Sequence, residues 1–377
     1  MERLSDADAW AILNCMGDGV YVTDVERHIL FWNKAAEQIT GWKAEDLLGQ
    51  SCFNSILSHI DKDGRRLCGR DHCPLHRSIV TGESSECPLM FAKKSDGARI
   101  PLQTTVAPLR DGNGVIIGGV EVFRDLSPTF GDLQKAKAIQ SISLRHDLPP
   151  DGRVGFETLY IPHDVVGGDY YGVRRLNSDQ YGFFLADAMG HGLAAALYTM
   201  YLSALWDRYF PLLKIPSAFA AKMNSELSRI AGQGEAFAAG VCGMLDLSRQ
   251  ELLFAGAGNP PAIRIHADGG FELLDCSGVP FGVMADAPYH DVRVAVHPGD
   301  RLLFFSDGAT EICRADGKQL GIEGLIGILK RHGYPESSIQ AAPIAEELLT
   351  YSNAIRLEDD VTFMEIRLAR DLVPCQP

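Results

Sequence analysis

Acidic residues stand at the ends of apolar stretches in the second half of the sequence, where they could bind a cation or a phosphate group. Residues 183–197 (FFLADAMGHGLAAAL) begin with an apolar run, reach Asp187, and pass through Gly190 and Gly192 into a run of strong helix formers. This pattern predicts a buried strand that carries a carboxylate to its tip, then a tight turn and a helix. Taken alone, the stretch fits an ordinary strand–turn–helix corner, with a solvated aspartate that caps the helix, equally well.

Other aspartates of the same half occupy similar places beside apolar runs or glycine turns, namely Asp169, Asp307, Asp359 and Asp360. Carboxylates that converge at one end of a sheet repel one another unless cations neutralise them. An all-oxygen ligand set suits Mg²⁺ or Mn²⁺ better than zinc or copper. Two such ions about 3.5–4 Å apart would activate a water for in-line attack on phosphorus. The alternative is a set of unrelated surface aspartates near turns.

The composition excludes several other classes of protein. The chain has 377 residues and a formal net charge of −14 without a compensating Lys/Arg cluster, which argues against general nucleic-acid binding. It has no apolar run of the roughly 18 residues that a membrane helix needs, and no P-loop or nucleophile-elbow motif. Nine cysteines without a secretory signal favour reduced thiols. We therefore expect a cytoplasmic protein of two or three domains that binds neither nucleic acid nor membrane.

The first 125 residues alternate short strand patterns with turns. The patterns predict five antiparallel strands, with helices only in the middle of the segment and packed on one face of the sheet; the strands are at 19–23, 28–32, 86–93, 100–109 and 115–123. A helix capped by Asn33 is predicted over 34–39, ending at Gly41.

Four segments of this region together resemble a PAS sensor domain over residues 8–127: DGVYVTD (18–24), FWNKAAEQITGW (31–42), KSDGARIP (94–101) and GGVEVFRDLS (118–127). The resemblance implies a sensor whose ligand is unidentified, because PAS domains bind haem, flavin, small metabolites or nothing. It also implies that this region gates the activity of a domain located after it in the chain.

A group of cysteines within the region could have a role of its own. Cys52, Cys68, Cys73 and Cys87 lie within 36 residues and could bind a metal or an iron–sulfur cluster, or act as a redox switch. Their spacings lack the CxxC pair of a typical zinc site, so buried or incidental cysteines are the favoured alternative.

Residues 128–150 form a connector between two domains. Residues 132–144 place Leu133, Ala136, Ile139 or Gln140, and Ser143 or Leu144 at helical spacing, which predicts an amphipathic helix. Such a helix could pack on one domain, or pair with its copy in a homodimer and carry a signal.

Beyond the connector, residues 151–370 predict a second domain and residues 371–377 a C-terminal tail. Strands are expected at 154–160, 180–187, 238–246, 251–257, 262–266, 301–305 and 361–368, and the turn over 163–171 is expected to lead into another strand. Helices are expected after Gly192, over 215–231 and over most of 336–352.

Six motifs in this domain look like those of the metal-dependent protein phosphatase (PPM) family, in its SpoIIE/RsbU branch and in the family's order. They are VVGGDYYGV (165–173), ADAMGHG (186–192), AGAGNPPAI (255–263), GVPFGV (278–283), LLFFSDGATE (302–311) and EDDVTFMEIR (358–367). With the connector, the resemblance covers residues 133–369. It implies an α-β-β-α sandwich with a dimetal site between its sheets, so that the whole chain is an α+β protein with an N-terminal PAS sheet.

Carried over by position, the resemblance assigns roles to residues of the acidic set. Asp169, Asp187, Asp307 and Asp359 would bind two Mn²⁺ or Mg²⁺ ions and form the catalytic site, with Asp187 bridging the ions. The Ala188 carbonyl would add a ligand, Asp360 would bind directly or through water, and His191 could touch substrate or serve in packing. The branch usually has an aspartate where Gly172 stands and often a histidine where Asn259 stands, which places substrate contacts or regulation in doubt more than catalysis.

The resemblance implies a PAS-regulated protein serine/threonine phosphatase. Its substrate would be a phosphorylated STAS-domain anti-anti-sigma factor, whose dephosphorylation releases a sigma factor. The PAS domain and the connector helix would join two copies in a homodimer. The alternatives are a signalling scaffold without catalysis and a small-molecule phosphatase of the same fold.

Overall fold

The computed structural model describes residues 6–53, 56–69, 72–144, 148, 150–190, 192–230, 237–354 and 356–370. The chain falls into two compact units, Met1–Asp132 and Leu133–Pro377. Over the described ranges, no helix combines the length and the apolar character needed to cross a membrane.

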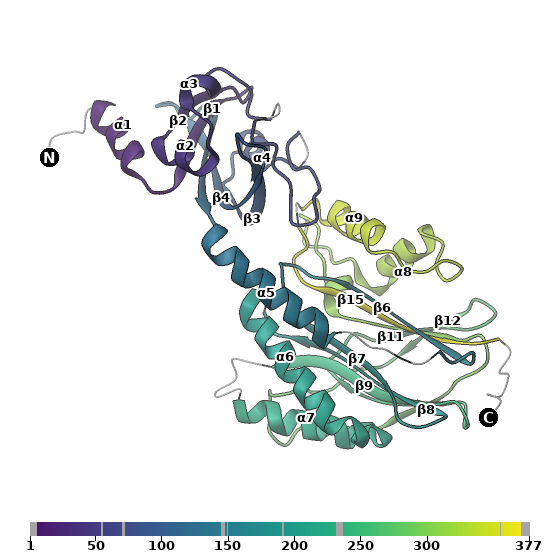
Figure 1. Ribbon diagram of the computed structural model, residues 1–377. Helices are drawn as coiled ribbons and strands as arrows, with labels where there is room; N and C mark the ends of the chain where they lie inside the picture. Colours follow the sequence, from purple (N-terminus) through teal and green to yellow (C-terminus); the bar gives the residue numbers. More distant parts are fainter. Residues whose placement is uncertain are drawn as a thin grey trace. The chain divides into compact units, whose positions relative to one another are not determined.

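The first unit is built on one five-stranded antiparallel sheet, as the strand patterns predict (Figure 1). The strand order is β2-β1-β5-β4-β3. The first and the last strand in the chain, β1 and β5, therefore lie side by side in the interior of the sheet. The strands are β1 (Gly19–Asp24), β2 (Ile29–Trp32), β3 (Ser85–Lys93), β4 (Arg99–Arg110) and β5 (Ile116–Asp125).

Helix α2 (Lys34–Thr40) forms where its capping residues predict it. The Asn33 side chain accepts a hydrogen bond from the Ala36 backbone N–H at 2.8 Å, and Gly41 ends the helix with a φ of 77°. The unit also contains α3 (Ala44–Leu47) and α4 (Pro74–Thr81). The expectation that helices lie only in the middle of the region is wrong, because α1 (Asp6–Cys15) precedes the first strand; Trp10 of α1 packs edge-on against Phe31.

The second unit contains two five-stranded sheets that pack face to face. One has the order β13-β10-β9-β8-β7 and the other β12-β11-β14-β15-β6. The strands of the first are β7 (Asp169–Arg175), β8 (Gln180–Ala188), β9 (Ala238–Asp246), β10 (Glu251–Ala257) and β13 (Val292–Ala295). Those of the second are β6 (Val154–Ile161), β11 (Ala262–Ile265), β12 (Phe271–Leu274), β14 (Arg301–Phe305) and β15 (Val361–Leu368).

Alternation along β8 shows how the layers are held together. Phe183 points between the sheets and lies 4.7 Å, ring centroid to ring centroid, from Phe304 of β14. The next residue, Phe184, points the other way and packs with Trp206 and Phe219 of the covering helices. Helices therefore cover both outer faces (Figure 1): α6 (Gly192–Tyr209) and α7 (Pro216–Ile230) on one, α8 (Gly321–Arg331) and α9 (Ala341–Ser352) on the other. This is the expected α-β-β-α sandwich.

Two details of the second unit differ from the sequence prediction. Helix α9 begins at Ala341, not near 336, and places Pro343 in its first turn, where no backbone N–H is needed. The edge strands β12 and β13 and helix α8 were not predicted; all four residues of β13 are exposed or half-buried, so that edge strand has no clear apolar pattern.

The connector forms helix α5 (Ser127–Ser143), close to the predicted span. The sequence left two inner positions open, between Ile139 and Gln140 and between Ser143 and Leu144. The structure buries Gln140 and Leu144. Ile139 is 55% exposed.

Candidate active site

Three carboxylates converge between the two sheets of the second unit. One oxygen each from Asp187, Asp307 and Asp359 lie within 4.8 Å of one another, and all three side chains are half-buried. Asp187 lies near the end of β8, Asp307 follows β14 in a short 3₁₀ turn (Asp307–Ala309), and Asp359 precedes β15. Each sheet therefore contributes to the group, as the strand-end positions of these residues predict.

Asp169 lies beside the group at the start of β7, where strand pairing sets it directly opposite Asp187. Its side chain is fully buried, and its Oδ2 accepts a hydrogen bond from the Thr362 hydroxyl at 2.5 Å. Thr362 belongs to the other sheet, so this bond joins the two sheets at the site.

Burial and mutual repulsion dominate the electrostatics of the site. Burial, with the charges of Asp169 and Asp307, raises the pKa of Asp187 well above its ordinary value. Burial and the Asp360 charge raise the pKa of Asp169 in the same direction. Burial and the charge of Asp307 also raise the pKa of Glu311. These carboxylates are unfavourable neighbours unless a positive charge separates them.

The donor set fits divalent cations. Asp169 Oδ1 and Asp307 Oδ1 are buried and have no hydrogen-bond partner among the described residues. A buried carboxylate oxygen without a donor costs free energy that a metal ligand bond would offset. Carboxylate oxygens are also the ligands that Mg²⁺ and Mn²⁺ prefer.

Asp360 is fully buried, and both of its oxygens already accept backbone hydrogen bonds. Oδ1 accepts from the His163 N–H at 2.6 Å and Oδ2 accepts from the Gly168 N–H. The side chain thus holds the turn that leads into Asp169. Its role as a metal ligand stays a prediction.

Backbone groups also approach the site. The Ala188 N–H donates to the Gly168 carbonyl at 3.1 Å, and a Cβ added to Gly168 would lie 2.7 Å from the Ala188 carbonyl oxygen. Only glycine fits at that position without a shift of the backbone. The Ala188 carbonyl therefore lies against Gly168, the residue before Asp169, and metal binding by it stays a prediction. The predicted substrate residue His191 lies outside the described residues.

Three polar residues, Thr362, Ser306 and Asn259, form hydrogen bonds that hold the site residues in place, a role that the sequence patterns did not assign to them. Thr362 donates to Asp169, and its own N–H donates to the Ser306 hydroxyl at 2.9 Å. The Asn259 amide donates to the Phe305 carbonyl at 3.2 Å and so fixes the end of the strand before Asp307. Their partners lie 46 to 193 residues away in sequence, so no local pattern indicates these hydrogen bonds.

The four cysteines that the sequence analysis grouped in the first unit, Cys52, Cys68, Cys73 and Cys87, do not form a comparable group. Cys52, Cys73 and Cys87 are buried and Cys68 is half-buried. None of their sulfurs belongs to a group of three or more candidate ligand atoms within 4.8 Å in the described part of the chain. Burial raises the pKa of the Cys68 thiol to about 12, and also raises that of Cys52, which leaves both protonated and weakly reactive at neutral pH. Their metal or redox role stays a prediction.

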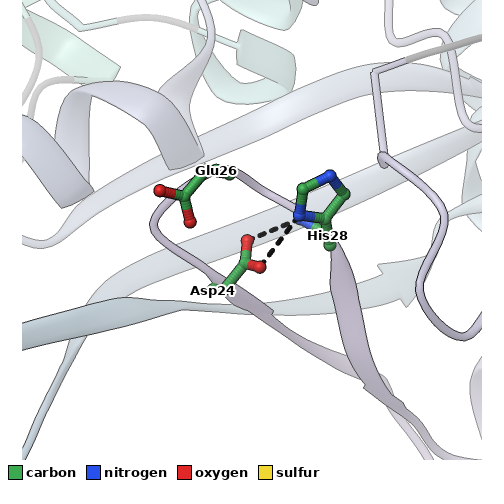
Figure 2. Close-up of side chains that lie close together, drawn as sticks. All are labelled: Asp24, Glu26 and His28. Atoms are coloured by element: carbon green, nitrogen blue, oxygen red, sulfur yellow. Dashed lines mark hydrogen bonds and ion pairs between the residues drawn. The ribbon is translucent and has the colours of Figure 1, made fainter.

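A second group of candidate ligand atoms lies at the turn between β1 and β2 (Figure 2): Asp24, Glu26 and His28. Asp24 accepts a hydrogen bond from the His28 N–H at 2.7 Å and lies 2.9 Å from the His28 ring Nδ1. Glu26 and His28 are exposed. The Asp24 carboxylate closes the hairpin turn, which accounts for this group without a metal.

Comparison with protein families matches both units. The family model described as Stage II sporulation protein E (SpoIIE) matches residues 177–369, which is half of the chain, and the PAS fold matches residues 8–126. The matched ranges include Asp187, Asp307 and Asp359, whereas Asp169 lies before the SpoIIE match.

Two Bacillus subtilis proteins resemble the chain in sequence. Phosphoserine phosphatase RsbP is 28% identical over 228 residues, covering 59% of this chain and 53% of RsbP. Phosphoserine phosphatase RsbU is 22% identical over 240 residues, covering 63% of this chain and 70% of RsbU. The match thus spans about half of the length of RsbP.

Among solved structures, the SiaA-PP2C domain of Pseudomonas aeruginosa superposes with a TM-score of 0.53 at 24% identity. The match covers 64% of this chain and 98% of that domain. It shows that the second unit has the fold of a PP2C-type domain, in agreement with the two stacked sheets and their covering helices. With carboxylates converging between those sheets and the family match over residues 177–369, the chain belongs to the SpoIIE family and carries a PAS domain ahead of its family domain.

Proposed function

We propose that the chain is a metal-dependent phosphatase that removes phosphate from a phosphoserine or phosphothreonine of a protein, under control of its PAS domain. The observation that carries the proposal is the convergence of Asp187, Asp307 and Asp359 within 4.8 Å between two sheets. The buried oxygens of Asp169 and Asp307 that lack a hydrogen-bond donor among the described residues support a cation site there.

Asp169, Asp187, Asp307 and Asp359 would hold two Mn²⁺ or Mg²⁺ ions, with the Ala188 carbonyl and Asp360 as further candidates. When bound, such ions bind the phosphate oxygens and lower the pKa of the attacking water. The chain's own residues fix the ligands: Thr362 orients Asp169, and Asp360 holds the turn before it. Because both sheets supply ligands, packing of the sandwich sets the separation of the carboxylates.

The proposed substrate is a phosphorylated STAS-type anti-anti-sigma factor in a sigma-factor partner-switching pathway. The support is the resemblance to the SpoIIE/RsbU branch and the similarity to RsbP and RsbU, whose names describe phosphoserine phosphatases. The PAS match ahead of the family domain supports sensory control.

A homodimer through the PAS domain and the connector helix belongs to the same proposal. Ile139 and Ile142 of α5 are 55% and 66% exposed, which leaves apolar surface on the connector that a second copy could cover. Light scattering of the full chain at micromolar concentration should give twice the mass of the chain; a single-chain mass would contradict this part of the proposal.

The test of catalysis is phosphate release by the full chain from a phosphorylated STAS protein and from p-nitrophenyl phosphate, with Mn²⁺, Mg²⁺ or EDTA. We expect metal-dependent release that Asp187→Asn abolishes while the fold is kept. The matched control is Asp268→Asn, an exposed aspartate in the turn after β11, at the opposite end of the sheet from Asp307; its amide can still accept from the Gly270 N–H.

The outcomes separate the alternatives. Retained turnover in Asp187→Asn would refute the assignment of the metal site. Turnover of small phosphomonoesters but not of the STAS protein would favour a small-molecule phosphatase. Metal binding without release from either substrate would favour a scaffold without catalysis.

A further inference from the structure

Helix α5 buries a polar side chain where an amphipathic helix normally buries apolar ones. Gln140 is 3% exposed, whereas Ile139 and Ile142 on the same helix remain largely in solvent. Burying an amide costs free energy unless its hydrogen bonds are replaced, and leaving isoleucines exposed forgoes stabilisation. The arrangement therefore points to a specific role for the amide rather than to packing.

The Gln140 amide forms hydrogen bonds with both backbone polar groups of Gly167. Its Nε2 donates to the Gly167 carbonyl at 2.7 Å, and its Oε1 accepts from the Gly167 N–H at 3.3 Å. The same Nε2 donates to the Thr199 hydroxyl of α6 at 2.8 Å, and Thr199 in turn donates to the Ala196 carbonyl at 2.8 Å. All of these residues belong to the second unit.

Gly167 begins the short turn that carries the chain into Asp169. The following residue, Gly168, donates its N–H to Asp360 and accepts from the Ala188 N–H. A Cβ at Gly167 would collide with the Tyr160 hydroxyl and the Asp360 carboxylate, and one at Gly168 would approach the Ala188 carbonyl. The turn is thus enclosed on several sides, so a restraint on Gly167 is transmitted to the backbone of Asp169.

We infer that Gln140 is a positioning residue for the metal centre: its amide holds the Gly167–Gly168 turn so that Asp169 and the Ala188 carbonyl face the cations. The inference rests on the proposed function, because it concerns the same site. Gln140 hydrogen-bonds to Gly167 and Thr199 and to none of the site carboxylates, so it acts through Gly167. Supporting groups of this kind typically change metal affinity or activity by about 10- to 100-fold when removed.

The test compares variants of the full chain by calorimetric titration with Mn²⁺ and by phosphate release as a function of Mn²⁺ concentration. Gln140→Met keeps the size of the side chain and removes every hydrogen bond. Gln140→Glu keeps an acceptor for the Gly167 N–H but sets an oxygen against the Gly167 carbonyl. Gln134→Met, at an exposed position of the same helix, is the matched control.

We expect Gln140→Met and Gln140→Glu to weaken Mn²⁺ binding by about 10-fold or more, with turnover largely restored at saturating Mn²⁺, and Gln134→Met to bind like the parent. If Gln140→Met does not fold, the Mn²⁺ affinity of Gln140→Glu tests the inference in its place. Parental Mn²⁺ affinity in a folded Gln140 variant would overturn the inference, as would equal weakening in Gln134→Met.

The calorimetric readout keeps this inference apart from the proposed function. A parent chain that binds Mn²⁺ without turnover, with weaker binding in Gln140→Met, would support the positioning role and overturn the catalytic proposal. A parent chain with Mn²⁺-dependent turnover whose Gln140 variants match it would overturn only the positioning role. A parent chain that binds no Mn²⁺ would overturn both.

Discussion

Replacing Glu121 of the PAS domain with glutamine should stabilise the first unit above neutral pH. Glu121 lies on β5 and is 2% exposed; its Oε2 accepts from the Tyr21 hydroxyl at 2.6 Å. Its Oε1 faces His59 Nε2 at 3.7 Å, beyond hydrogen-bond distance. The Cys52 and Cys73 thiols also face this cluster. Burial raises the pKa of Glu121 to about 7 and lowers that of His59 to about 4, so at pH 5.5 the two side chains are a neutral pair, not an ion pair.

The size of the effect can be worked out from the pKa of Glu121. Its ordinary value is 4.5, so the folded state holds the proton more tightly than the unfolded state does. The stability that this proton contributes is complete below pH 4.5 and is lost as the pH rises to about 7. At 1.36 kcal/mol per pKa unit, the total loss is about 3 kcal/mol, of which about 2 kcal/mol falls between pH 5.5 and 8.5. Glutamine keeps the carbonyl oxygen for Tyr21 and never ionises.

Urea unfolding of the full chain, followed by tryptophan fluorescence at pH 5.5 and 8.5, measures this difference. Trp10, Trp32 and Trp42 of the chain's four tryptophans lie in the first unit, so the signal reports mainly on that unit. The contribution of His59 is the same in both proteins and cancels. Glu86→Gln, at an exposed position of β3, is the control and should show no pH-dependent difference. The reasoning is refuted if the advantage of Glu121→Gln over the parent does not grow with pH.

Three further predictions concern the second unit. Gly168→Ala should weaken Mn²⁺ binding in calorimetry, because its Cβ would lie 2.7 Å from the Ala188 carbonyl oxygen, while Gly152→Ala, which meets nothing within 4 Å, should bind normally. Phe184→Ala, at a fully buried ring, should lower the free energy of unfolding by about 3–5 kcal/mol in urea titrations, whereas Leu273→Ala, 52% exposed, should change it by less than about 0.5 kcal/mol. Mn²⁺ at 100 times its Kd should raise the free energy of unfolding by about 2.7 kcal/mol, and a similar rise in Asp187→Asn would contradict the metal site.

The carboxylates of the candidate site could be located from sequence because each interrupts an apolar pattern. Asp187 ends the run of buried residues in β8, and Asp307 comes after a strand of five residues that is mostly buried. A charge at the end of such a run must lie where a strand leaves the core, and two stacked sheets bring several such ends together. The same physics explains the successful strand predictions in the PAS region, where turns and apolar runs alternate.

Elements without a burial pattern were harder to predict. Strand β13 pairs with β10 but has no buried residue, and β12 buries only Leu274. An edge strand is specified by backbone pairing with its neighbour, which leaves little trace in side-chain hydropathy. Helix α1 was missed for a related reason, since five of its last six residues, including Trp10 and Ile12, are exposed and its burial follows no clear period.

The residues that hold the carboxylates in place were beyond sequence reasoning for a different reason. Thr362, Asn259 and Gln140 are neutral donors of hydrogen bonds to partners 27 to 193 residues away. A neutral donor disturbs no apolar pattern strongly enough to be singled out, and at position 140 the helical spacing alone allowed either Ile139 or Gln140 to face inward. Gln140 rather than Ile139 is buried because the carbonyl and N–H of Gly167 need a donor and an acceptor at this position, and isoleucine can supply neither. In this domain, charge thus indicates where the candidate site lies, while hydrogen bonds from neutral side chains hold the carboxylate Asp169 and the turn before it in position.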